Sequence, residues 1–153
     1  MARTFIDYKE NKGFEINESY MQLAFCYIYQ EAKKSHYIFS NRENLFYDFE
    51  ASINGHRYGY FVLNWDEELV SNIDEQIMLQ VLQNVKTALQ VKGTYISVAE
   101  LQSIPTEDKD FKRLFSRKPF PTVELVKIVD ALIKMLEGTW DSTNYNMEIN
   151  YSY

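Results

Sequence analysis

Few residues in this sequence are able to do nucleophilic or metal chemistry: one cysteine, Cys26, and two histidines, His36 and His56. Cys26 lies between Phe25 and Tyr27 with no neighbouring base or cation to favour a thiolate, so we interpret it as a small core residue. The two histidines lack the short spacing of a zinc-binding pair, and no cysteine cluster accompanies them. The sequence therefore predicts no metal site and no cofactor.

Motifs of the familiar enzyme families are also missing. There is no Gly-x-Ser-x-Gly sequence, and five scattered glycines form neither a phosphate-binding loop nor a dinucleotide fingerprint. The acidic pairs Asp66/Glu67 and Glu107/Asp108 lack calcium-loop spacing. We predict no catalytic residue. One alternative stays open, a small enzyme whose site is assembled in the fold from His56, nearby tyrosines and carboxylates.

Residues 109–120 interleave five bases with three aromatic residues, a composition typical of single-stranded nucleic-acid contacts. The net charge of the whole chain is −6, which opposes binding to phosphates. Helical spacing also places Phe111 and Phe115 on one face, with Leu114 beside them, and leaves the bases for solvent. We therefore expect the rings to be buried and the chain to bind no nucleic acid.

Negative charge is concentrated in two stretches of the chain. Residues 58–85 contain five acids and no base, and residues 135–153 contain three acids and no base. A domain with its charge distributed in this way steers a basic partner towards one side. The sequence thus predicts a basic partner rather than an acidic one.

Aromatic residues accompany both acidic stretches. They make up 16% of the chain, more than a core requires, which is typical of proteins that work through a contact surface. The predicted partner-binding residues are Tyr58, Tyr60, Trp65, Asp66, Glu67, Glu68, Asp74 and Glu75. The C-terminal stretch adds Tyr145, Tyr151 and Tyr153. The alternative is that some of these rings complete the core.

The elements that must position these side chains fit one domain. A chain of 153 residues, 46% of them hydrophobic, buries its own core, and we expect a single domain over 1–153. A lone cysteine forms no internal disulfide, and the sequence has no apolar run of signal-peptide or membrane-spanning length. We therefore expect a cytoplasmic protein outside the membrane.

Helices dominate the predicted secondary structure. A capping box at Ser19 opens a helix that reaches about residue 34, and a long helix covers about 74–91, with Gly93 as its stop. A second capping box at Ser97 opens a short helix that ends before residue 105, and another short helix lies within 107–118. Thr122 is the expected cap of a last helix, which Gly138 closes.

Strands are predicted at the two ends of the chain. Residues 3–8 form a short strand, and residues 144–151 alternate apolar and polar side chains with the period of a strand that has one buried face. Together with the helices, these strands predict an α+β fold that is predominantly α-helical.

Residues 42–64 fit two structures. As a hairpin, alternating residues around Tyr47 and Tyr60 flank the favoured turn Asn54-Gly55. As a helix, Asn41 caps the start, Gly55 ends it, and a strand follows over 58–63. Acidic residues inside the first half favour the helix, which is our prediction.

In overall character this small, acidic, tyrosine-rich chain resembles the bacterial immunity proteins that neutralise polymorphic or contact-dependent growth-inhibition toxins. The resemblance covers the whole chain, rests on no diagnostic motif and transfers no functional residue. It implies stoichiometric inhibition of a cognate toxin, often a basic nuclease, by covering its active site or substrate groove. The alternatives are the small enzyme described above and a regulatory adaptor that mimics the charge of nucleic acid.

Overall fold

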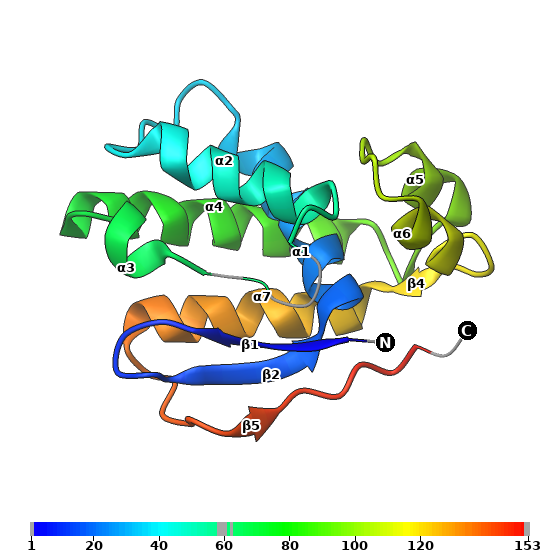
Figure 1. The fold of residues 1–153 in the computed structure, drawn as a ribbon. Coiled ribbons are helices and arrows are strands. Elements are labelled where there is room, and N and C mark those ends of the chain that lie inside the picture. The colour runs from blue at the N-terminus through cyan, green and yellow to red at the C-terminus, as the bar shows by residue number, and fades with distance from the viewer. Residues whose placement is uncertain (1, 58–60, 62, 152–153) are drawn as a thin grey trace.

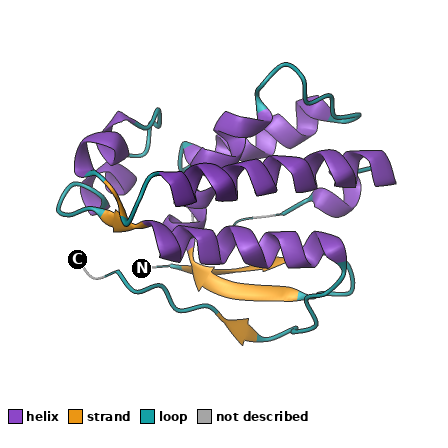
Figure 2. Ribbon diagram, turned by 180° about the vertical axis from the view of Figure 1, so that it is seen from behind, coloured by secondary structure: helices purple, strands orange, loops and turns teal. Residues whose placement is uncertain are grey.

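The computed structural model describes residues 2–57, 61 and 63–151, and over these residues it contains seven helices and two small sheets (Figures 1 and 2). This confirms the predicted α+β fold with helices predominant. The elements are β1 (Arg3–Asp7), β2 (Gly13–Asn17), α1 (Glu18–Ala32), α2 (Arg42–Ile53), α3 (Trp65–Glu68), α4 (Asn72–Val91), β3 (Tyr95–Ile96), α5 (Val98–Ser103), α6 (Lys109–Leu114), β4 (Phe120–Pro121), α7 (Thr122–Glu137) and β5 (Tyr145–Asn146).

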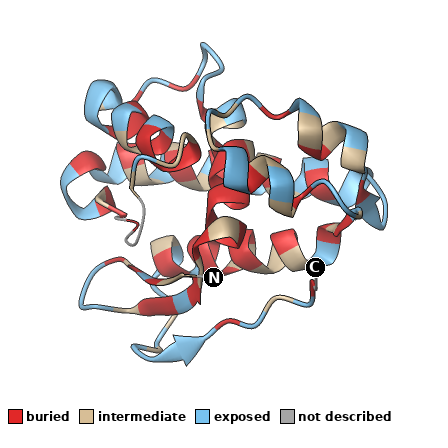
Figure 3. Cartoon of the chain, turned by 45° about the vertical axis from the view of Figure 1, so that its right-hand side comes forward, coloured by how far each residue is buried: buried red, intermediate tan, exposed pale blue. Residues whose placement is uncertain are grey.

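Helix α1 lies at the centre of the core. Every residue from Tyr20 to Cys26 is buried, the pattern of a helix surrounded on all sides. It contacts α2, α4 and α7, and α4 packs along α7. Figure 3 shows the buried positions gathered on this central helix and on the inward faces of its neighbours. One continuous hydrophobic cluster therefore joins residues from both ends of the chain.

The larger sheet, in the order β1-β2-β5, covers one side of the helices (Figure 1). β1 and β2 form an antiparallel hairpin in which Ile6 is paired with Phe14, and β5 joins β2 in parallel. Gly13 is required at the hairpin, because a Cβ there would lie 1.8 Å from the carbonyl oxygen of Ile6. The turn continues through left-handed backbone at Lys9, Glu10 and Asn11, so its conformation is tightly constrained.

Several predicted helix boundaries are confirmed. The Ser97 hydroxyl caps α5 by accepting a hydrogen bond from the backbone N–H of Glu100, and Gly138 ends α7 in left-handed conformation. The helix prediction for residues 42–54 is also confirmed, because α2 occupies this range and Gly55 follows with a φ of 77°. In α2, Phe49 packs edge-on against Phe25 of α1, a long-range contact that the helical spacing makes possible.

Two cap predictions are wrong. α1 begins at Glu18, so Ser19 lies inside the first turn; the chain enters the helix directly from β2, and the backbone N–H of Glu18 donates to the carbonyl of Ala2. Thr122 is the first residue of α7 rather than its cap. Its hydroxyl donates a hydrogen bond to the backbone carbonyl of Gly93, tying the start of α7 to the end of α4.

The strand predictions have mixed outcomes. The N-terminal strand is confirmed as β1, whereas the C-terminal strand is limited to Tyr145–Asn146. Its predicted alternation persists in irregular extended chain, because Met147 and Tyr151 are buried while Glu148 is exposed. Most of the strand expected at 58–63 lies outside the described residues, and Phe61 and Leu63 belong to no strand.

In the basic, aromatic segment 109–120 the rings are buried as predicted, but one base is not left for solvent, because the half-buried Lys112 ammonium donates to the backbone carbonyls of Gln102 and Ile104. Phe111, Phe115 and Phe120 are buried and pack their rings against one another, while Arg113 and Arg117 face solvent. No helix in the described part of the chain is both long and apolar enough to cross a bilayer.

Candidate functional site

The structure places the predicted aromatic anchors away from the surface or outside its description. Trp65, the first residue of α3, is only 1% exposed and packs edge-on against Tyr8, with 6.3 Å between ring centroids. It is therefore a core residue, and the expectation that it becomes buried against a partner is corrected. Tyr58 and Tyr60 lie outside the described residues. The alternative, in which some rings complete the core, holds for Trp65.

Glu68 also points inward and contributes no charge to the surface. Its carboxyl is buried beside Asp48, and burial first, then the hydrogen bond and charge of Asp48, raise the pKa of Glu68 to about 9. Glu68 is therefore protonated and neutral at pH 7. It acts as a hydrogen-bond donor to Asp48 rather than attracting a cation.

Asp48 keeps the negative charge of this buried pair. Burial alone would raise the pKa of Asp48, but the hydrogen bonds from Glu68 and Asn64 and the charge of Arg57 hold it below its usual value. The amide of Asn64 donates at 3.0 Å, and the Arg57 guanidinium contacts the other carboxylate oxygen. The Glu68 proton, shared in the hydrogen bond to Asp48, thus joins α3 to α2, and the Arg57 guanidinium balances the charge of Asp48.

Asp74 is buried as well, and it acts as a joint between three segments. One carboxylate oxygen accepts hydrogen bonds from the backbone N–H and the hydroxyl of Ser40, at 3.0 and 3.1 Å. The other accepts from the backbone N–H of Val70 at 3.0 Å. Asp74 thereby fixes the loop before α2 and the loop after α3 against the start of α4, where Ser71 is the N-cap.

The three remaining predicted residues lie at the surface or close to it. Asp66 and Glu67 are exposed on α3. Glu75 is half-buried, and its carboxylate accepts hydrogen bonds from the Tyr8 hydroxyl at 2.7 Å and the Lys9 ammonium at 2.9 Å. Together with the hydrogen bond from the Lys9 backbone N–H to Asp66, these contacts hold the tip of the β1–β2 hairpin against α3 and α4, which are more than fifty residues further along the chain.

We name this region the acidic corner. It comprises the carboxylates of Asp7, Glu10, Asp66, Glu67, Glu75 and Asp141, together with Lys9 and Lys12.

The electrostatic character of the acidic corner is seen at Asp7. Burial and then the nearby charge of Asp66 raise the pKa of Asp7 above its ordinary value. Lys9 pairs with Glu75, and Lys12 lies 3.2 Å from Glu10 and 3.8 Å from Asp141. The corner thus contains six carboxylates and only two lysines, which leaves it strongly negative.

Sequence reasoning missed a set of exposed apolar side chains beside this corner. Ile38, Val70 and Ile73 are 76%, 60% and 72% exposed, and we name them the apolar patch. The sequence offered one sign of this patch at Ile73. The buried face of α4 begins with Asp74 and Met78, so an isoleucine at position 73 lies off that face and is exposed. Exposed apolar residues that gather in one place mark interaction surfaces.

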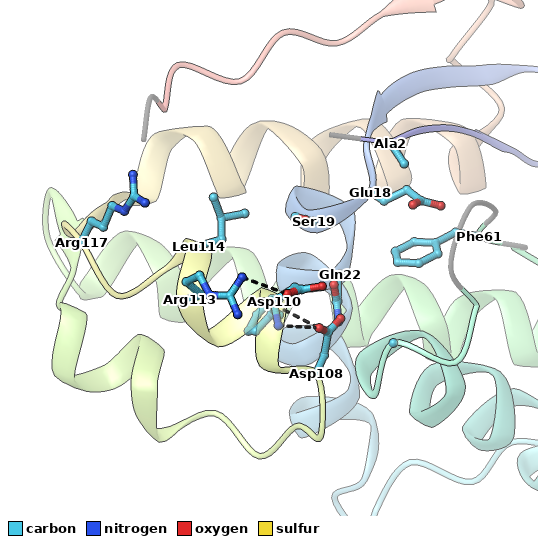
Figure 4. Close-up of a pocket in the computed structure, with 12 residues that line it drawn as sticks. Ala2, Glu18, Ser19, Gln22, Phe61, Asp108, Asp110, Arg113, Leu114 and Arg117 are labelled. Atoms are coloured by element: carbon cyan, nitrogen blue, oxygen red, sulfur yellow. Dashed lines mark hydrogen bonds and ion pairs between the residues drawn. The ribbon is translucent and has the colours of Figure 1, made fainter.

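A cavity of about 330 Å³ with a mixed polar and apolar lining lies between α1 and α6 (Figure 4). Asp108 is one of the residues that line this cavity. One carboxylate oxygen caps α6 by accepting from the backbone N–H groups of Asp110 and Phe111, and the other accepts from the Gln22 amide at 3.0 Å. A Cβ on Gly55 would lie 2.6 Å from the same carboxylate. Asp108 therefore holds α6 against α1 and the end of α2.

The residues considered for nucleophilic or metal chemistry do not converge. Cys26 is a buried free thiol whose pKa burial raises to about 12. His36 lies exposed before α2, and His56 lies exposed after it, 3.6 Å from Glu107. Across the described residues, no group of three or more His, Cys, Asp or Glu side chains is arranged to hold a metal ion.

Comparison with family models, with curated proteins and with solved structures found no match to this chain. The acidic corner and the apolar patch are the surface features that bear on function.

Proposed function

We propose that this protein is an immunity protein that binds a cognate bacterial toxin and inhibits it by covering its active site or substrate groove. The partner is a basic protein, and the contact needs no cofactor and no catalytic step by this chain. The observation that carries the proposal is the acidic corner, where six carboxylates from the hairpin, α3, α4 and the chain after α7 gather around two lysines.

The folded position of these acids supports a role in recognition. Asp66 and Glu67 project from α3 into solvent, while Glu68 on the same helix is turned inward and neutral. The outward carboxylates attract a basic surface over a distance of about one Debye length, roughly 8–10 Å at physiological salt. They therefore raise the rate at which a basic toxin meets this face of the protein.

The compartment follows from the same proposal. A toxin that acts inside the cell must be neutralised there, and a free buried thiol at Cys26 fits a reducing environment. We thus propose that the protein acts in the cytoplasm.

Expression of the neighbouring reading frame in the native locus tests the function. We expect its product to stop growth when expressed alone, and co-expression of this chain to restore growth and to yield a complex that purifies with one copy of each protein. A neighbouring product without toxicity, or toxicity that this chain leaves unchanged, would refute the proposal.

Charge reversal tests the acidic corner within a confirmed complex. The double variant D66K/E67K is expected to slow association on the order of tenfold at low salt and to flatten the dependence of that rate on salt. The matched control is E107K/D110K, which changes the net charge equally at exposed positions near the opposite end of the fold. Equal association rates for the two double variants would contradict a specific role for the corner.

A further inference from the structure

We propose that the apolar patch is the contact centre for the partner: Ile38, Val70 and Ile73 receive an apolar side chain of the toxin whose neighbouring basic residues lie over the acidic corner. This inference rests on the proposed function and names the chemistry of the partner surface. It is carried by the exposure of the three side chains, by the joint that holds them, and by the charge next to them.

The three side chains come from segments that the fold brings together. Ile38 precedes the loop residue Ser40, Val70 follows α3, and Ile73 lies in the first turn of α4. The buried carboxylate of Asp74 binds Ser40 and Val70 at once, and Asp74 is the residue after Ile73. Asp74 therefore ties the backbone at Ser40, two residues after Ile38, and at Val70 to the helix turn that carries Ile73.

The same region is hollowed. A shallow groove of about 440 Å³ lies along the first turns of α4; Ile73 is the patch residue that lines it, together with Ile77, His36 and Tyr37. Two hydrogen bonds fix the Tyr37 side chain: its hydroxyl donates to Glu31 at 2.6 Å and accepts from the Asn84 amide. The lining of the groove is largely apolar, so it suits an apolar side chain of the partner.

Anchoring lowers the entropic cost of binding at this surface. Flexible loops must be ordered when a partner binds, and each ordered side chain subtracts from the affinity. Here the two loops are already tied to α4 through Asp74, so the patch is preorganised. Preorganised apolar residues near the centre of an interface supply most of the binding free energy, and charged residues at its rim set the orientation.

Charge decides which occupant fits. Asp66 and Glu67 lie exposed just before Val70 in the chain, at the acidic corner, whereas Lys34, two residues before the groove residue His36, is paired with Glu31 at 2.8 Å. A partner with basic residues on the α3 side is complementary. A second copy of this chain, packed by a two-fold axis through the patch, is the competing occupant, and the oligomeric state of the free protein tests it.

Neutral polar variants isolate the apolar contribution. I38Q/I73Q removes the two most exposed isoleucines without changing charge or the helix-forming character of residue 73. The matched control is V91Q/V123Q, at exposed valines near the end of α4 and the start of α7. We expect I38Q/I73Q to lose about thirtyfold or more in affinity for the neighbouring reading frame's product, and the control to bind as the wild type does.

The outcomes separate the two proposals. If the wild type binds the toxin and both double variants bind equally well, the patch is refuted while the immunity function stands. If the wild type neither binds nor protects, the immunity function is refuted, and a peptide titration decides the patch independently.

That titration uses isotope-labelled protein and two short amphipathic peptides of equal length, one of lysine and leucine and one of glutamate and leucine. We expect the lysine peptide to shift the backbone amide resonances of Ile38, Val70 and Ile73, less strongly at high salt, and the glutamate peptide to leave them unchanged. Absence of these shifts, or equal shifts with both peptides, would overturn the patch. So would a dimer of the free protein that I38Q/I73Q abolishes, because the occupant would then be a second copy.

Discussion

Replacing Glu68 with glutamine tests how the inner side of α3 is held. The buried Glu68 carboxyl donates its proton to Asp48, and burial together with Asp48 raises the pKa of Glu68 from 4.5 to about 9. The folded protein therefore holds a proton at this position at neutral pH, whereas the unfolded chain does not. Glutamine has the same shape, donates an amide N–H to Asp48 and needs no proton, so E68Q is expected to be more stable than the wild type at pH 7.

The magnitude follows from proton linkage. Between about pH 5 and about pH 8 the folded state binds one more proton at Glu68 than the unfolded state, so the free energy of unfolding falls as pH rises. The limiting slope for one proton is about 1.4 kcal/mol per pH unit, and the average over the window is on the order of 1, because the unfolded chain is still partly protonated near pH 5 and the folded protein begins to lose its proton near pH 8. The wild type should therefore lose about 3 kcal/mol through Glu68 over this window.

Urea unfolding at several pH values between about 5 and about 8, followed by tryptophan fluorescence, measures this difference. E68Q should lack the contribution of Glu68 to the slope, so the stabilities of the two proteins should diverge as pH rises. D48N is the companion variant: it leaves Arg57 without its carboxylate partner and should be less stable than the wild type throughout. Parallel pH profiles for the wild type and E68Q would refute a protonated Glu68.

Three further predictions follow from other buried contacts. G13A should destabilise the fold by about 3 kcal/mol or more in urea unfolding, because the added Cβ would clash with the Ile6 carbonyl, which lies 1.8 Å away; wild-type stability would contradict the hairpin geometry. D74N should cost about 1–3 kcal/mol, because the amide cannot accept at both oxygens, and should speed hydrogen exchange at the backbone amides of Ser40 and Val70; unchanged exchange would contradict the joint. The Cys26 thiol should resist a thiol reagent in the folded protein and react fully in denaturant, because burial raises its pKa to about 12; rapid labelling without denaturant would contradict its burial.

The α3 region shows why local charge counts misjudge a surface. α3 has four residues, two facing outward and two inward, so its acids divide between solvent and core. Asp66 and Glu67 are exposed at the acidic corner, while Glu68 is neutralised beside Asp48. The net charge that a partner meets is therefore smaller on α3 than the sequence implies, and the hairpin residues Glu10 and Asp7 supply the remainder.

Much of the fold was predictable because it depends on local pattern. The apolar spacing in α4 and α7 specifies a buried stripe, and the serine of α5 and the glycine after α7 specify helix ends through contacts within one turn. The helix at 42–53 follows from the low strand propensity of its acidic residues. The caps predicted at Ser19 and Thr122 were wrong because contacts with Ala2 and Gly93, distant in sequence, set those helix starts.

By itself, the sequence determined the helical class, the main helices and the excess of acids over bases in residues 58–85, all of which depend on residue type and spacing along the chain. Only the tertiary structure decided which of those acids face water. Trp65 is inside because Tyr8 covers it, Glu68 because Asp48 accepts its proton, and Asp74 because Ser40 and Val70 donate to it. Each of these partners except Val70 lies outside the acidic stretch, and no periodicity within a short helix or loop encodes a contact with a residue far along the chain.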